Sequence, residues 1–243
     1  MRDIHLGLDV GAEWVKLAVI RSSDDGVEIA HTDAIEHRKD PHSAIVALLS
    51  RVELRRARGL AVTGRLAGVV NAESVPTKAA MRRGVRLLHR EHDAVTLLSI
   101  GAHGFSVLEV GRNGEEWFQQ NSRCSQGTGN FLTQLVERFG LTVEQAAALA
   151  DGVEDPAHLS GRCPVILKTD MTHLANKGED RGRIVAGLYA AVCDNVLTLV
   201  RTRLAPRSVV LIGGVSRAAR VRRTIARWLS HRGMQLAPAG SHD

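Results

Sequence analysis

A repeated hairpin pattern constrains the fold of this chain more than any other feature. Twice, two strand-like runs flank a short glycine-bearing turn, and a third strand-like run follows, which is typical of β-meanders. The runs and turns are residues 4–10, Gly11-Ala12-Glu13, 14–20 and 27–32, then residues 94–100, Gly101-Ala102-His103-Gly104, 105–110 and 116–120. We therefore predict an internally duplicated α/β fold. Its halves are residues 1–80 and 94–232, and residues 233–243 form a loose tail.

Apolar residues at helical spacing predict the remaining elements. Thr142 and Gln145 match a capping box, which places the start of one helix. Buried strands are expected at residues 59–63 and 208–212. Helices are expected at residues 41–52, 76–92, 127–139, 142–150, 164–176, 180–204 and 216–231.

The first hairpin turn brings together residues that suit a phosphate. Glycine at Gly11 lets backbone N–H groups approach an anion, and Asp9, one step before the turn, can hold a hydrated metal ion beside Lys16. Gly213-Gly214 joins a strand to a helix, which is a geometry for nucleotide approach. A cleft between the two halves is a natural nucleotide site. Taken alone, however, a glycine-bearing hairpin is usually only a hairpin.

Two cysteines lie at expected helix N-termini. Cys124 precedes Gly127-Thr128-Gly129 and Cys163 precedes Pro164, where unpaired N–H groups and the helix dipole favour a thiolate. Two such thiols suit a soft metal or an iron–sulfur cluster. A cluster usually needs four protein ligands, which a twofold dimer would supply. The alternative is two buried, inert thiols, and Cys193 is expected to belong to the core.

Composition limits the possible partners. The formal net charge is +6, yet only five of the 32 basic residues are lysine, which indicates coding bias. With 3% aromatic residues, no aromatic side chains interleave with the basic clusters to stack on bases. No apolar run is long enough for a membrane span, and no signal segment opens the chain. Three widely spaced cysteines argue against a disulfide framework. We expect a cytoplasmic protein that binds neither nucleic acid nor membrane.

The order of these motifs resembles a known family. Gly7-Leu8-Asp9-Val10-Gly11 with Lys16, Thr63-Gly64, Cys124-Ser125-Gln126-Gly127-Thr128-Gly129, Cys163 and Gly213-Gly214-Val215 follow one another. The same order is found in the activator ATPases, or component A, of 2-hydroxyacyl-CoA dehydratases and in the ATPase subunits of benzoyl-CoA reductases. The resemblance covers almost the whole chain, and Cys-x-x-Gly-Thr-Gly is its most specific part.

The resemblance implies an actin/Hsp70/sugar-kinase-like (ribonuclease H-like) fold, ATP or ADP with Mg²⁺, and one [4Fe-4S] cluster shared across a homodimer or a heterodimer of homologous subunits. It also implies a low-potential electron that comes from a donor such as ferredoxin or flavodoxin and passes to an acyl-CoA dehydratase or reductase. Asp9 and Lys16 would be catalytic, and Cys124 and Cys163 would hold the cluster. The nucleotide would be bound by Gly11, Ala12, Glu13, Gly101, Ala102, His103, Gly213, Gly214 and Val215.

The chain also departs from the family. Where the second phosphate loop of the family reads Asp-Ile-Gly-Gly-Gln-Asp, this chain reads Ser99-Ile100-Gly101-Ala102-His103-Gly104. Both carboxylates are lost, so hydrolysis is expected to be slow or absent. Of the acidic residues that follow the second cysteine in the family, only Asp170 remains. The family's chains also usually continue through a further strand and helix, so this chain is expected to be either truncated or part of a longer polypeptide.

Three functions therefore stay open at this stage. The first is an ATP-driven reductive activator. The second is a degenerate subunit that binds the cluster and the nucleotide beside an intact paralogue. The third is a small-molecule kinase of the same fold with inert cysteines.

Overall fold

The computed structural model describes residues 3–23, 26–121, 128–160 and 163–238. The chain divides into two compact units, and the boundary lies between Gly84 and Val85. Each unit has its own five-stranded sheet and its own apolar core. Every helix among the described residues is too short or too polar to cross a lipid bilayer.

The first unit is a sheet of order β3-β2-β1-β4-β5. Strands β1 to β3 form an antiparallel meander, whereas β4 runs parallel to β1 and β5 parallel to β4. Alternate residues of β1 are buried, and Leu48 of helix α1 packs into the same core. The elements are β1 (Asp3–Val10), β2 (Trp14–Ser23), β3 (Gly26–Glu36), α1 (Pro41–Leu49), β4 (Ala57–Thr63) and β5 (Glu73–Ser74).

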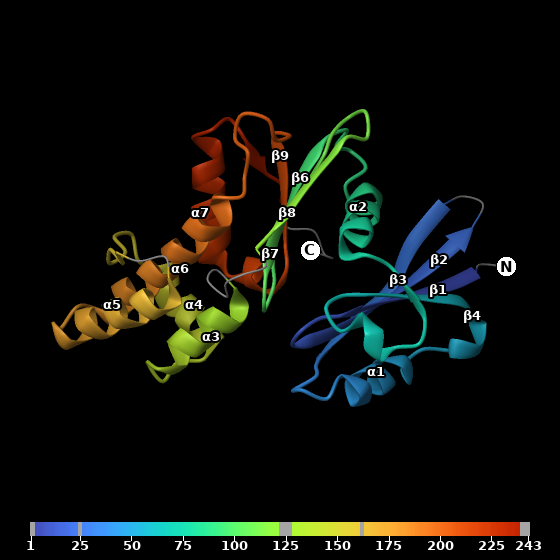
Figure 1. Ribbon diagram of the computed structural model, residues 1–243, viewed down its shortest axis with the longest axis horizontal. Coiled ribbons are helices and arrows are strands. Elements are labelled where there is room, and N and C mark those ends of the chain that lie inside the picture. The colour runs from blue at the N-terminus through green and yellow to red at the C-terminus, as the bar shows by residue number, and fades with distance from the viewer. Residues whose placement is uncertain (1–2, 24–25, 122–127, 161–162, 239–243) are drawn as a thin grey trace. The chain divides into compact units, whose positions relative to one another are not determined.

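The second unit has a sheet of order β8-β7-β6-β9-β10 with an added group of helices. Helix α2 (Thr77–Leu88) enters this unit, and the helices α3 to α6 are inserted between β8 and β9 (Figure 1). The other elements are β6 (Val95–Ile100), β7 (Phe105–Val110), β8 (Glu116–Gln120), α3 (Gly129–Glu137), α4 (Val143–Asp151), α5 (Pro164–Asn176), α6 (Arg181–Leu197), β9 (Ser208–Ile212), α7 (Ala219–Ser230) and β10 (Gln235–Leu236).

The two sheets repeat one topology. In each, an antiparallel three-strand meander is followed by a strand that pairs in parallel with the first strand of the meander, and a two-residue strand completes the edge. Strands β6 to β10 thus correspond to β1 to β5 in sequence order. The internal duplication predicted from the two hairpins is confirmed.

Helix α6 ends earlier than predicted. It stops at Leu197, because Leu199 N and Val200 N donate to carbonyls three residues back, at Val196 and Leu197, instead of continuing the α-helical pattern. Val200 is still buried. Leu199 and Val200 are therefore spaced as in a helix because they pack against the core, although the backbone there is not helical.

The segment after Gly233 is more ordered than predicted. Gln235 N donates to Arg207 O at 2.8 Å, and Ala237 N donates to Val209 O at 2.7 Å. Met234 and Ala237 are buried. The expectation of a loose tail is wrong for residues 234–237, because their backbone groups pair with the edge of β9. Residues 239–243 lie outside the described residues.

Candidate functional site

In the first unit, three polar side chains form a row at one end of the sheet, at the carboxyl ends of β1 and β4 and the amino end of β2. Asp9 of β1 lies opposite Lys16 of β2 and opposite Thr63 of β4. Residues directly opposite one another point to the same face of a sheet. Lys16 Nζ donates to Asp9 Oδ2 at 2.9 Å. We call these three residues the polar row.

Gly64 brings the end of β4 close to Asp9. Its φ of +100° lies in the left-handed region, and a Cβ at this position would be 2.5 Å from both Asp9 Oδ1 and Val10 O. Only glycine fits such a close approach. The hydroxyl of Thr63 is buried beside this contact and has no hydrogen-bond partner among the described residues. A buried hydroxyl without a partner next to a carboxylate can form a hydrogen bond with a further polar ligand.

The turn of the first hairpin is held in part by residues between β3 and α1. Gly11 N donates to Trp14 O at 2.9 Å. The carboxylate of Glu13 pairs with Lys39 Nζ at 2.7 Å, and its carbonyl accepts from His37 N at 2.9 Å. The side chain of Glu13 is thus engaged with the loop between β3 and α1. Its predicted contact with a nucleotide stays a prediction, as do those of Gly11 and Ala12.

In the second unit, the equivalent turn is bound by helix α3. Gly101 N donates to Gly104 O at 2.8 Å and closes the turn, which also contains the half-buried His103. Gly129 N and Asn130 N then donate to Gly101 O and Ala102 O at 2.9 and 2.8 Å.

This contact corrects one expectation. The N-terminal amides of the helix that follows Cys124 were predicted to be unpaired. Instead, the first two bind the hairpin turn, and Phe131 N donates to Thr128 Oγ1 at 3.4 Å. The start of α3 is therefore satisfied within the unit.

Gly213 and Val215 lie next to the same turn, whereas a Cβ at Gly214 would meet nothing within 4 Å. Gly213 has a φ of +95°, and a Cβ there would overlap Ile100 O. A Cβ at Gly129 would be 3.2 Å from Val215 Cγ2 and 3.4 Å from Ala102 Cα. The structure thus brings Gly101, Ala102, Gly213 and Val215 together at the carboxyl ends of β6 and β9. Ligands of α/β sheets bind at such strand ends.

The polar row has no charged counterpart in the second unit. Ser99 of β6 corresponds to Asp9, and it lies opposite Ser106 of β7 and Ile212 of β9. Gly213 follows Ile212 as Gly64 follows Thr63, with nearly the same φ. The backbone geometry of the first unit is repeated, but its lysine and its carboxylate are absent.

Cys163 is an exposed residue at the N-cap of α5. Asp170, about two turns further along the helix, accepts from Ser160 N and Ser160 Oγ at 2.8 and 2.7 Å, which ties Ser160 to α5. The predicted helix start at Pro164 is confirmed. Cys124 lies outside the described residues. Cys193 is fully buried, as predicted.

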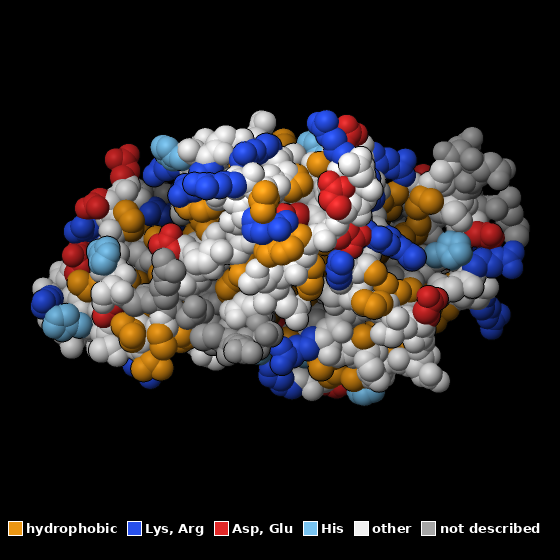
Figure 2. Space-filling model, turned by 45° about the horizontal axis from the view of Figure 1, so that its top comes forward, with side chains coloured by type: hydrophobic (Ala, Val, Ile, Leu, Met, Phe, Trp, Pro, Cys, Tyr) orange, Lys and Arg blue, Asp and Glu red, His pale blue; other side chains and the backbone are white. Residues whose placement is uncertain are grey.

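A cavity of about 450 Å³ lies away from these strand ends. It is lined by Arg112 and by residues around the starts of β6 and β9, at the opposite ends of those strands from Gly101 and Gly213. On the face drawn in Figure 2, Lys and Arg side chains are scattered among Asp and Glu side chains. The predicted absence of nucleic-acid binding stays a prediction.

Thr63 and Gly64 were not among the site residues chosen from the sequence. The available signal was the place of Thr63-Gly64 in the motif order that resembles the family. Its position beside Asp9 follows only from the parallel pairing of β1 and β4.

Comparisons with known proteins agree with this architecture. The 2-hydroxyisocaproyl-CoA dehydratase activator of Clostridioides difficile is 25% identical over 228 residues, which are 91% of this chain and 85% of the relative. The (R)-2-hydroxyglutaryl-CoA dehydratase activating ATPase of Acidaminococcus fermentans is 23% identical over 223 residues, or 89% and 85% of the two chains.

Among solved structures, the activator of the 2-hydroxyisocaproyl-CoA dehydratase from Clostridium difficile with bound ADPNP has a TM-score of 0.83 at 23% identity, and the match covers 96% of this chain and 87% of that one. The predicted actin/Hsp70/sugar-kinase-like fold is confirmed. The sequence model of the BadF/BadG/BcrA/BcrD ATPase family matches residues 6–242. With the repeated sheets and the motifs at their strand ends, this match shows that the chain belongs to the BadF/BadG/BcrA/BcrD ATPase family.

Proposed function

We propose that this protein is an ATP-dependent reductive activator, which passes a low-potential electron from a [4Fe-4S] cluster shared by two subunits to an acyl-CoA dehydratase or reductase. The polar row of the first unit carries the proposal. It offers a lysine, a carboxylate and an unsatisfied hydroxyl at the strand ends, and relatives of this chain are named as dehydratase activators.

The polar row fits a magnesium nucleotide. Lys16 would neutralise phosphate charge, and Asp9 would hold the hydrated Mg²⁺, which prefers one or two carboxylates with several waters. Thr63 Oγ1 would gain the hydrogen-bond partner that the described protein atoms do not give it. Gly11 and Ala12 would offer backbone N–H groups to the phosphates. In the second unit, Gly101, Ala102 and His103 would form a phosphate loop, and Gly213, Gly214 and Val215 would lie against the adenosine end.

The exposed thiol of Cys163 fits a cluster ligand, and Cys124 would supply the second. When bound, a [4Fe-4S] cluster supplies one low-potential electron. Cys163 lies at the N-cap of α5, and its exposure leaves the sulfur accessible to a metal ion.

An apolar surface next to Cys163 supports the proposed dimer. Val165 is 70% exposed and Ile166 is 48% exposed, both in the first turn of α5. Large exposed apolar side chains that adjoin one another often mark a protein contact. A second subunit, either another copy or a homologous chain, would cover them and bring two further thiols to the same place. The electron donor would be a ferredoxin or a flavodoxin.

The nucleotide part is tested by ATP hydrolysis. We expect Lys16→Ala and Asp9→Asn to lower the hydrolysis rate by about a hundredfold or more, since each removes a charge that positions the phosphates. Arg21→Ala is the matched control, because Arg21 is exposed on the same strand. Hydrolysis that is equal in all four proteins contradicts the role of the polar row.

The cluster part is tested by iron and sulfide analysis of oxygen-free protein. We expect about four irons per dimer, and loss of the iron in Cys124→Ala and in Cys163→Ala. Cys193→Ala is the control, because its thiol is fully buried in the core. Iron that persists in both variants removes the cysteines from the cluster site.

One observation favours a second function. Ser99, Ser106 and Ile212 replace the polar row in the second unit, so the protein would bind the nucleotide and the cluster without appreciable hydrolysis. It would then act as one subunit beside an intact paralogue. Wild-type protein that contains iron and binds ADP, but does not hydrolyse ATP, supports this second function and contradicts the first.

A further inference from the structure

A group of metal-ligating side chains lies outside the proposed nucleotide and cluster sites. His89, Glu91 and His92 follow the last residue of helix α2 and precede strand β6. One ligand atom from each lies within 4.8 Å of the other two. These residues belong neither to a strand nor to the polar row.

The distances suit a metal ion. His89 Nδ1 and His92 Nε2 are each 3.5 Å from Glu91 Oε1. Neighbouring ligand atoms around a tetrahedral Zn²⁺ are about 3.4 Å apart, because the metal–ligand bonds are about 2.1 Å long. The two imidazole rings are nearly parallel, with an interplanar angle of 10° and centroids 6.2 Å apart. A nitrogen of each ring thus faces the same carboxylate oxygen.

The backbone already holds this arrangement. His89 N donates to Val85 O at 2.9 Å, which continues the last turn of α2, and His92 N donates to His89 O at 3.1 Å, which turns the chain back. The side chain of His89 is 10% exposed and that of His92 27% exposed, whereas that of Glu91 is 61% exposed. A pre-organised pair of histidines with one accessible side leaves a coordination position open to water.

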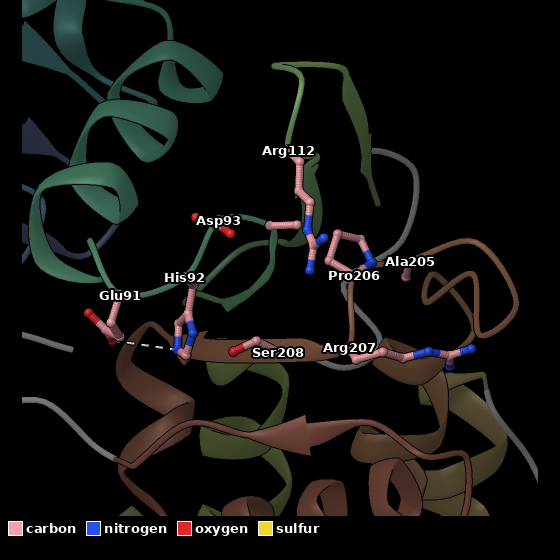
Figure 3. Close-up of a pocket in the computed structure, with 9 residues that line it drawn as sticks. Glu91, His92, Asp93, Arg112, Ala205, Pro206, Arg207 and Ser208 are labelled. Carbon is pink, nitrogen blue, oxygen red and sulfur yellow. Dashed lines mark ion pairs between the residues drawn. The ribbon is translucent and has the colours of Figure 1, made fainter.

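Both acidic and basic side chains line the cavity beside His89, Glu91 and His92. Glu91 and His92 line the cavity of about 450 Å³ together with Asp93, Arg112 and Arg207. Figure 3 shows that Arg112 points into the cavity between Asp93 and Pro206, while the side chain of Arg207 runs away from Glu91 and His92. The carboxylate of Glu91 lies next to the two histidines.

We propose that His89, Glu91 and His92 form a divalent-metal site of the Zn²⁺ type, with water in the remaining position. Two imidazoles and one carboxylate are ligands that Zn²⁺ takes in proteins. The ion would join the end of α2 to the segment that leads into β6. This site is independent of the proposed activator function.

The test is titration of the full, tag-free chain with Zn²⁺ by calorimetry, and with Co²⁺ by visible absorption. Because thiolates also bind Zn²⁺, the titration is repeated in a Cys124→Ala/Cys163→Ala background. We expect one ion per chain in that background. We also expect His92→Ala to lower the affinity by about a hundredfold. Removing a residue that only hydrogen-bonds a metal ligand already costs about 10–100-fold, and His92 would be a ligand itself.

Two further variants keep the result interpretable. Glu91→Gln changes a mostly exposed side chain, so it tests ligation without disturbing the fold, and we expect it to weaken binding as well. His231→Ala is the control, because His231 is exposed at the end of α7. Equal affinity in the wild type, His92→Ala and Glu91→Gln overturns the proposal, and so does an equal loss in His231→Ala.

Discussion

Gly64 and Gly213 are the residues whose backbone conformation most restricts substitution at the strand ends. Both have φ near +100°, and a Cβ at either would overlap the end of the neighbouring strand, β1 or β6. An L-residue in this conformation costs about 1–3 kcal/mol before any clash is counted. At Gly64 the added Cβ would overlap both Asp9 and Val10, so a substitution there would displace a side chain of the polar row.

Gly64→Ala should therefore lower both stability and nucleotide hydrolysis. We expect the free energy of unfolding to fall by about 2–4 kcal/mol, from strain and overlap together. Urea denaturation measures the first effect and an ATPase assay the second. Gly68→Ala is the control, since a Cβ at Gly68 meets nothing within 4 Å. A Gly64→Ala protein as stable and active as Gly68→Ala would contradict the close approach.

Cys193 gives a prediction for alkaline pH. Burial, and then the charge of Asp194, raise the pKa of its thiol from 9.0 to about 12. The folded protein thus binds this proton more tightly than the unfolded chain does. The contribution of Cys193 to stability is complete below pH 9 and is lost as the pH rises from 9 to about 12.

Between pH 9 and 10, the wild type should lose about 1 kcal/mol more of its free energy of unfolding than Cys193→Ala does. The slopes of stability against pH are compared, because the substitution also leaves a cavity that shifts stability at every pH. Parallel slopes for the two proteins would show that the thiol ionises as easily in the folded state as in the unfolded chain.

At the scale of elements, one partly buried ion pair links β7 to the segment after α6. Arg201 Nε donates to Glu109 Oε1 and Oε2 at 3.3 and 3.1 Å, and Arg201 Nη2 also donates to Oε2. The Arg201 guanidinium carbon lies 4.1 Å from the centroid of the Trp117 ring on β8. The side chain of Glu109 is only 4% exposed. This pair fixes the chain where α6 has just ended.

Arg201→Met should destabilise the protein, because it leaves the carboxylate of Glu109 buried without a partner. Such a loss costs about 3–5 kcal/mol for a fully buried pair. The Arg201 side chain is 35% exposed, so we expect about 2–3 kcal/mol in urea denaturation. Adding Glu109→Leu should restore most of the loss. Arg56→Met, which breaks an exposed pair with Glu53, should change stability by less than about 0.5 kcal/mol.

Local signals predicted most of the elements. The capping box of Thr142 and Gln145 is present at the start of α4, and Pro164 begins α5. The two failures have different causes. The end of α6 at Leu197 is set by the turn that follows it, where burial continues without a helical backbone. Strand β10 forms by pairing with β9, from which it is separated in sequence by α7, so a window of neighbouring residues does not reveal it.

At the scale of the molecule, the duplication explains what the sequence revealed about the site and what it did not. Asp9 and Lys16 were found because a glycine-bearing turn lies between them. Thr63 was missed because it reaches Asp9 only through the parallel pairing of β1 and β4. The duplication also accounts for β10, whose counterpart β5 is a two-residue edge strand as well, although the sequence predicts a loose tail there.

Because each unit has its own core, we expect local destabilisation in one unit to spare the other. Leu48→Ala removes a fully buried side chain of α1, which costs about 2–5 kcal/mol. Amide hydrogen exchange, resolved by peptide, should become faster in residues 3–84 and stay unchanged in residues 85–238. The control is Val46→Ala, since Val46 is 67% exposed on the same helix. Faster exchange throughout the chain would mean that the two units unfold as one.

The left-handed glycine that closes each pair of parallel strands has a consequence for how such a chain changes over time. Peptide carbonyls and a positive φ maintain the loop shape at Gly213, and neither depends on the side chains that bear charge. Charged side chains at the strand ends can therefore be substituted without a change in the shape of the loop. In the second unit this has happened at the positions equivalent to the polar row, where Ser99, Ser106 and Ile212 stand within the same backbone frame.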